Sequence, residues 1–122
     1  MAALLVAGCT APRPAAPPPV GVSEISERPG ERALLAALRA YDEADYAAVE
    51  RQAAQALSLG LQSPRDRGLA HKLRAFVACT SDRLPACEAE FRAARAEDPS
   101  FALTRAEAGH PIWGPVYQRS RQ

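Results

Sequence analysis

The sequence lacks several features that would assign a function directly. It has no run of about 20 apolar residues, the length that a membrane-spanning helix needs. It has only two histidines, and it shows no Ser–His–Asp grouping, no metal-binding triad and no glycine-rich loop that could hold a phosphate. The sequence therefore predicts no catalytic site, no metal and no cofactor, and we expect a protein that is not an enzyme.

Charge of one sign is not concentrated anywhere in the chain. The 122 residues carry a formal net charge of +1, and the 15 basic residues, all arginine except Lys72, are interleaved with 14 acidic ones. Nucleic-acid binding needs clustered positive charge, so we expect no nucleic-acid partner. A chain of this length forms one small domain at most, and its limited buried surface predicts marginal stability.

An apolar segment at the N-terminus ends at a cysteine. Val6, Ala7 and Gly8 precede Cys9, and nothing before them is charged. This pattern resembles the end of a bacterial lipoprotein signal peptide, whose cysteine is lipidated and becomes the mature N-terminus. The resemblance implies that residues 1–8 are a signal-peptide remnant with its start further upstream, and that Cys9 carries a lipid. The alternative is an ordinary apolar N-terminus with a chance cysteine.

A proline-rich stretch follows the cysteine. Five prolines lie between Pro12 and Pro19, and such a sequence favours extended polyproline II structure without packing. We therefore predict a flexible linker over residues 9–30 that holds the domain away from lipid headgroups. A proline-motif ligand for a partner domain is the alternative. Thr10 in place of Asp after the cysteine favours the outer membrane, with the domain facing the periplasm.

From Glu31 onward the sequence is rich in alanine, leucine, arginine and glutamate, and apolar residues recur every three or four positions. This period predicts four helices, each burying one face, in a domain over residues 31–108. The four apolar stripes are Leu34, Leu35, Leu38 and Tyr41; Tyr46, Val49, Ala53 and Leu57; Leu69, Leu73, Phe76 and Val77; and Leu84, Cys87, Phe91 and Ala94.

The residues between these stripes suit helix ends. Gly60 fits a helix C-terminus, and Ser63 fits an N-cap directly before Pro64. Asp82 fits the N-cap of the fourth helix, with Pro85 in its first turn. Because the connections are short, neighbouring helices must run antiparallel.

The second and fourth segments share one spacing, apolar–x–x–small–x–x–x–apolar–x–x–Ala, which begins at Tyr46 and Leu84. This resembles the tetratricopeptide repeat. The resemblance implies that small residues lie where helices cross and that Tyr46 and Leu84 fill the space between them. We predict an all-α fold of two tandem antiparallel helical hairpins with a short C-terminal capping segment, the alternative being an unrelated helical bundle.

Two cysteines remain if Cys9 is lipidated. Cys79 ends the third predicted helix and Cys87 lies in the first turns of the fourth, so the hairpin can bring them within disulfide range. We predict a structural disulfide. Two buried free thiols, or a redox or metal pair, are the alternatives, although the spacing is not that of a zinc or thioredoxin motif.

The C-terminal segment over residues 109–122 contains the most unusual string, "GHPIWGPVYQ". It either folds back to cap the helical stack or offers an exposed binding epitope anchored by Trp113 with Tyr117 and His110. The other histidine, His71, is expected on a helix face rather than as a ligand.

Residues 69–117 as a whole look like a family of small lipoproteins encoded with bacterial type VI secretion systems, called TssQ-type. The distinctive elements are the Ala70–His71–Lys72 string, the two cysteines around "TSDR", Asp98–Pro99 and "GHPIWGPVY". The resemblance implies an accessory, membrane-anchored protein of the periplasm rather than a known reaction.

These expectations combine into one functional hypothesis and one rival. The hypothesis is a lipid-anchored interaction module that binds a protein component of an envelope-spanning secretion apparatus through a small helical groove, with arginines at its rim attracting acidic segments. The rival is a lipoprotein that binds peptidoglycan or assists a lytic enzyme, for which only the region of Trp113 and Tyr117 offers aromatic residues. The protein could also scaffold its own oligomers.

Overall fold

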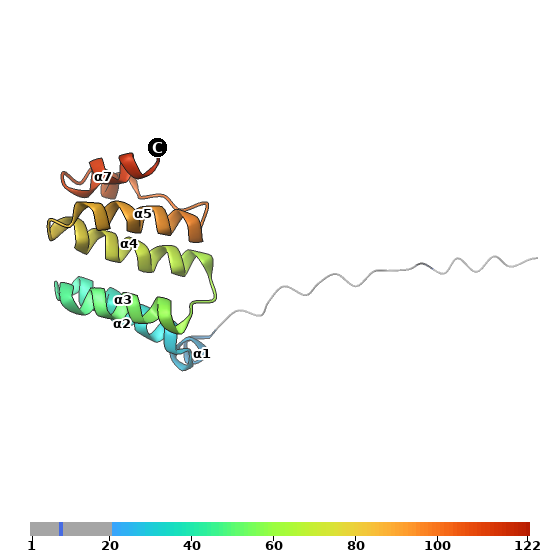
Figure 1. The fold of residues 1–122 in the computed structure, drawn as a ribbon. Helices are drawn as coiled ribbons and strands as arrows, with labels where there is room; N and C mark the ends of the chain where they lie inside the picture. The colour runs from blue at the N-terminus through green and yellow to red at the C-terminus, as the bar shows by residue number, and fades with distance from the viewer. Residues whose placement is uncertain (1–7, 9–20) are drawn as a thin grey trace, which may run out of the picture.

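The computed structural model describes Gly8 and residues 21–122, and the elements of this part are helices joined by short connections (Figure 1). They are α1 (Val22–Glu27), α2 (Pro29–Asp42), α3 (Tyr46–Leu59), α4 (Pro64–Thr80), α5 (Leu84–Glu97), α6 (Arg105–Ala108) and α7 (Trp113–Ser120). The described residues contain no strand, which confirms the predicted all-α class. None of the described helices has the length and apolar character needed to cross a bilayer.

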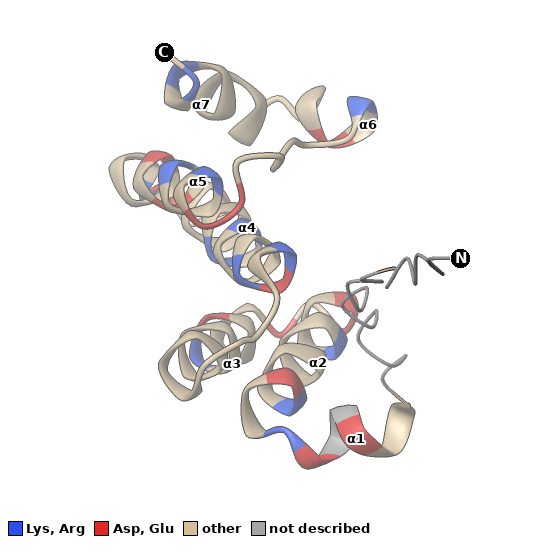
Figure 2. Ribbon diagram, turned by 90° about the vertical axis from the view of Figure 1, so that its right-hand side faces the viewer, with Lys and Arg blue, Asp and Glu red and all other residues tan. Residues whose placement is uncertain are grey.

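The helices pack as two successive hairpins with a C-terminal cover, as predicted. α2 pairs with α3, α4 pairs with α5, and α3 lies against α4 (Figure 1). α7 packs on α5 and α4 at the far end of the stack. Viewed from the side, α2, α4 and α6 lie along one side of the molecule, and α3, α5 and α7 lie along the other (Figure 2).

The helix ends predicted at Gly60 and Ser63 follow the local sequence. The Ser63 hydroxyl accepts hydrogen bonds from the backbone N–H groups of Arg65 and Asp66, which are otherwise unpaired at the start of α4. Gly60 follows α3 with a φ of 101°, a conformation that glycine adopts without steric cost.

The predicted N-cap role of Asp82 is wrong. Asp82 has a φ of 60°, and its N–H donates to the carbonyl of Cys79, so it completes the turn that ends α4. Aspartate tolerates this left-handed region better than most residues. Arg83 takes the N-cap position of α5 instead, without a side-chain hydrogen bond.

The core of the first hairpin is made of small side chains. Ala37, Val49, Ala53 and Ala56 are fully buried where α2 and α3 cross. At the open end of this hairpin, a Cβ added to Gly30 would lie 1.9 Å from the carbonyl oxygen of Gly60. The first hairpin is therefore close-packed because its helices carry alanine and glycine at the contact.

The second half of the core is aromatic. Phe76 on α4 is stacked with Trp113 on α7, at 3.9 Å between ring centroids, and packs edge-on against Phe91 on α5. Tyr117 packs edge-on against Phe91 from the other direction. These rings, together with Cys79, Cys87, Leu103 and Val116, form one buried cluster between α4, α5 and the C-terminal segment.

Only some positions of the spacing that α3 and α5 share are buried in the core. Val49, Ala53 and Ala56 in α3 and their counterparts Cys87, Phe91 and Ala94 in α5 are all fully buried. Tyr46 and Leu84, expected to fill the space between helices, are instead 46% and 39% exposed. The reason is their position, because each is the first residue of its helix and lies at the corner of its hairpin.

The helix α1 at the N-terminal end of the domain was not predicted from the sequence. α1 lies within the range 9–30 assigned to the linker, and it packs against α2. Cys9 and the proline run fall outside the described residues, so the predictions of lipidation and of an extended linker there stay predictions.

Candidate binding groove

A groove opens on the side of the molecule formed by α2 and α4. Its first part is a cavity of about 480 Å³. The apolar lining consists of Leu34, Leu35 and Leu38 from α2 and Leu69 from α4. Leu35 is 50% exposed, although Leu34 directly before it is buried. Apolar side chains gathered around a cavity are a feature of sites that bind another molecule.

Leucines line the groove because α2 has two apolar faces. One face of α2 is buried and consists of alanines and Leu34, together with Gly30 and Glu31 at the start of the helix. Leu35 and Leu38 lie beside this face and point toward the cavity next to α4. The predicted stripe of Leu34, Leu35, Leu38 and Tyr41 places all four on one buried face, and this is wrong for Leu35. Side-chain size does not separate the two groups, because Leu34 is as large as Leu35 and is buried at 5% exposure.

A second cavity of about 470 Å³ continues the groove toward α6. It shares Asp66 and Leu69 with the first cavity, and the rest of its lining is polar except for Phe101 and Ala102. One wall is α4, which contributes Arg65 and Lys72, and the other wall is the segment 98–107. The groove therefore changes from leucine-lined to charged along the side that carries α2, α4 and α6 (Figure 2).

The charge of this groove differs from the expected arginine-rich rim. The basic residues that line the two cavities are Arg28, Arg65 and Lys72, and the acidic ones are Glu31, Asp66, Asp98 and Glu107. Lys72 is already paired with Glu107. The lining thus offers both signs of charge and does not favour an acidic segment.

Glu107 is the most connected polar residue of the groove. Its carboxylate accepts a hydrogen bond from the Lys72 ammonium at 2.9 Å and another from the Thr104 N–H at 2.9 Å. The Thr104 hydroxyl accepts from the Glu107 N–H, which completes a capping box at the start of α6. Burial by itself raises the pKa of Glu107, but the bonds from Thr104 and Lys72 outweigh it and hold this pKa below its usual value.

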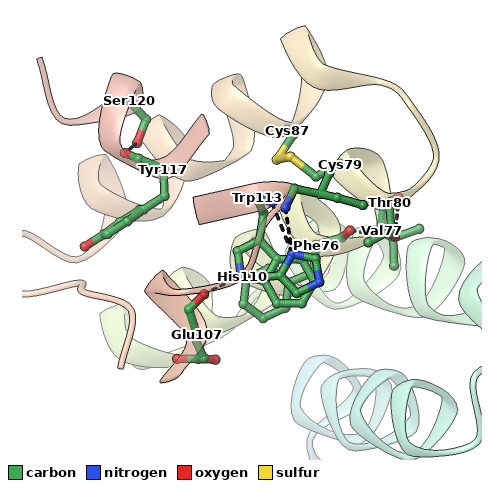
Figure 3. Close-up of a disulfide and its surroundings, with 11 residues drawn as sticks. Phe76, Val77, Cys79, Thr80, Cys87, Glu107, His110, Trp113, Tyr117 and Ser120 are labelled. Carbon is green, nitrogen blue, oxygen red and sulfur yellow. Dashed lines mark hydrogen bonds between the residues drawn. A yellow bond between two sulfur atoms is a disulfide. The ribbon is translucent and has the colours of Figure 1, made fainter. Parts of the chain in front are cut away.

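Two of the three candidate binding residues of the C-terminal segment are buried, and the third, His110, is half-buried (Figure 3). Trp113 and Tyr117 are only 8% and 4% exposed. The indole N–H of Trp113 donates to the Glu107 carbonyl at 2.7 Å, and the Tyr117 hydroxyl accepts from the Leu103 N–H at 3.3 Å. His110 stacks on Trp113 at 3.4 Å between centroids. The burial of Trp113 and Tyr117 favours the capping interpretation over an exposed epitope, because buried rings cannot anchor a partner.

The two remaining cysteines lie together at the closed end of the second hairpin. The sulfur atoms of Cys79 and Cys87 are at disulfide-bonding distance, with 5.1 Å between the Cα atoms (Figure 3). Both side chains are buried in the aromatic cluster. This geometry supports the predicted pairing and gives the bond a structural position between α4 and α5.

His71 lies on the face of α4 that meets α5, as expected for a helix-face residue. Its Nδ1 lies 2.7 Å from a carboxylate oxygen of Glu90, whose other oxygen is 3.2 Å from Arg74. Within the part of the chain that the structure describes, no three His, Cys, Asp or Glu side chains are grouped so that they could hold a metal ion.

Comparisons with known proteins identify no relative of this chain. No family model, no curated protein and no solved structure matches it. The resemblances to the tetratricopeptide repeat and to TssQ-type lipoproteins therefore stay predictions from the sequence.

Proposed function

We propose that this protein is a membrane-anchored accessory lipoprotein whose helical domain binds a protein component of a type VI secretion assembly in the cell envelope. The observation that carries the binding role is the groove, where the half-exposed Leu35 and its neighbours line a cavity about 480 Å³ in volume. A cavity of this size accommodates one or two apolar side chains of a partner helix or extended segment.

The proposed location of the protein and the identity of the assembly are supported by sequence patterns. The apolar segment that ends at Cys9 supports a lipid anchor, and the proline-rich stretch after it supports a spacer. The resemblance of residues 69–117 to TssQ-type lipoproteins supports the secretion system. The rival role in peptidoglycan binding has less support, because Trp113 and Tyr117, the aromatic residues it relies on, are buried.

Site-specific photocrosslinking in cells tests the binding role. A photoreactive residue in place of Leu35 is compared with one in place of Ala54, which is exposed on α3 on the other side of the molecule. We expect a covalent adduct with an envelope protein from position 35 and none from position 54. No adduct at position 35, or the same adduct at both positions, would contradict a role of the groove.

The anchor is tested separately by membrane fractionation and intact mass. The wild-type protein is expected in the membrane fraction with residues 1–8 removed and acyl chains added. Cys9→Ser is expected to be soluble and unmodified. An unmodified, soluble wild-type protein would remove the lipoprotein part of the proposal and leave the groove experiment unaffected.

A further inference from the structure

The polar end of the groove is built from two elements that are joined by one polar contact. α4 provides Arg65, Asp66 and Lys72, and the segment 98–107 provides the opposite wall. α6, at the end of that segment, packs on α7. In the described part of the chain, the ion pair between Lys72 and Glu107 is the only hydrogen bond or salt bridge between α4 and α6.

The atoms around this pair explain why it can fix the wall. The backbone of Glu107 is fixed by the C-terminal segment, because its carbonyl accepts a hydrogen bond from the indole N–H of Trp113. Its carboxylate is oriented by the Thr104 N–H and points to Lys72. The Lys72 ammonium in turn lies 5.7 Å from the centroid of the buried Phe76 ring, a favourable cation–π contact. The pair thus connects the C-terminal cap to the floor of the groove.

We infer that Glu107 is a positioning residue that closes the α6 end of the groove by holding Lys72, and thereby fixes the shape that the partner meets. The effect on the partner rests on the proposed function, whereas the closure itself does not. A wall that is fixed before binding favours association, because less conformational freedom is lost when the partner docks. Burial raises the pKa of Tyr41 on α2, and the nearby Tyr46 and the negative charge of Glu107 raise it further.

The test uses Lys72 as its own reporter, since it is the only lysine of the chain. Glu107→Gln removes the charge but keeps an amide oxygen that can accept the Thr104 N–H, so the capping box persists. Acylation of Lys72 by an amine-reactive reagent is followed by peptide mass mapping. Loss of the pair is expected to raise the acylation rate about two- to fivefold, the range for a partly exposed ion pair.

Glu97→Gln is the matched control, because it removes another carboxylate that pairs with a base of α4, here Arg67 at 2.7 Å. This control is expected to leave Lys72 acylation unchanged. An equal acylation rate in Glu107→Gln and wild type, at unchanged melting temperature, would overturn the inference.

The same variant is then combined with the photoreactive residue at position 35. A lower adduct yield in Glu107→Gln than in Glu97→Gln is the expected result. Raised acylation with an unchanged adduct yield would overturn the role of Glu107 in partner binding. Absence of any adduct in the wild-type background would count against the proposed function alone, because the acylation result stands without a partner.

Discussion

Trp113 joins three parts of the molecule through one side chain. Its ring is stacked on Phe76 of α4 and on His110, and its indole N–H reaches the backbone of α6 at Glu107. His110 supports this arrangement because its Nδ1 accepts hydrogen bonds from the N–H groups of Ile112 and Trp113. A residue with these contacts stabilises the fold, and its contribution is measurable as stability rather than as ligand binding.

Trp113→Ala is expected to lower the free energy of unfolding by about 3–5 kcal/mol, the usual cost of removing a buried large aromatic side chain. Thermal and urea unfolding followed by far-UV circular dichroism measures this loss. The neighbouring Ile112 is 45% exposed, so Ile112→Ala is expected to cost less than about 1 kcal/mol. Equal stability of Trp113→Ala and wild type would contradict the capping role and favour the role of Trp113 as an anchor for a partner.

Gly30 lies so close to the backbone of Gly60 that there is no room for a side chain. A methyl group there would collide with the Gly60 carbonyl, which is backbone and cannot rotate away. Gly30→Ala is therefore expected to cost about 1–3 kcal/mol by forcing the start of α2 away from the end of α3. Chemical unfolding measures the change.

Gly68→Ala provides the comparison for this variant. Its added Cβ would lie 3.3 Å from the Cβ of Asp98, a contact that a small shift relieves. Alanine also favours helix over glycine by about 1 kcal/mol, so this variant is expected to be near neutral or slightly stabilising. A greater loss in Gly68→Ala than in Gly30→Ala would contradict the packing described for the first hairpin.

At the scale of elements, the two hairpins are held by different means. The first is packed through alanines and a glycine, whereas the second has bulky aromatic side chains and the paired cysteines at its closed end. An ion pair between Glu50 on α3 and Arg83 before α5 also links the hairpins at the exposed surface. Exposed pairs of this kind contribute little, so apolar packing between α3 and α4 carries most of the stability of this contact.

Reduction of the Cys79–Cys87 bond is expected to lower the free energy of unfolding by about 2–3 kcal/mol, because the unfolded chain regains the freedom of a short loop. The measurement is urea unfolding with and without reductant, in a Cys9→Ser background that removes thiol exchange with the third cysteine. The helical signal of the reduced protein is expected to persist before the transition. An unfolding midpoint that does not respond to reductant would contradict a stabilising role of the bond.

At the scale of the whole molecule, the helical stack has a different cover at each end. α7 covers α5 and α4 at the C-terminal end, and α1 packs on α2 at the other (Figure 1). Between them the leucine-lined and charged cavities follow one side of the stack. The C-terminal cap therefore has two tasks, since it buries the aromatic cluster and supports the wall of the groove.

Removal of residues 109–122 is expected to abolish cooperative unfolding. It would remove the buried side chains of Trp113, Val116 and Tyr117, of which Trp113 alone contributes about 3–5 kcal/mol, from a domain whose total stability is on the order of 5–15 kcal/mol. Phe76 and Phe91 would then be exposed. Increased binding of a hydrophobic dye and loss of a sigmoidal melting curve would show this, whereas an unchanged curve would contradict the role of the cap.

The sequence alone determined the helical class, the order of the hairpins and the ends at Gly60 and Ser63, and it favoured the pairing of Cys79 with Cys87 over two free thiols. These features depend on local spacing and on short connections, which leave a chain few alternatives. The tertiary structure decided which apolar residues are buried. Leu35, Tyr46 and Leu84 fit the helical period but remain exposed, because burial depends on the neighbours that a helix acquires. It also decided that Trp113 points inward and that Lys72 meets Glu107, since these partners lie far apart in the sequence and only the packing of α7 and α6 brings them together.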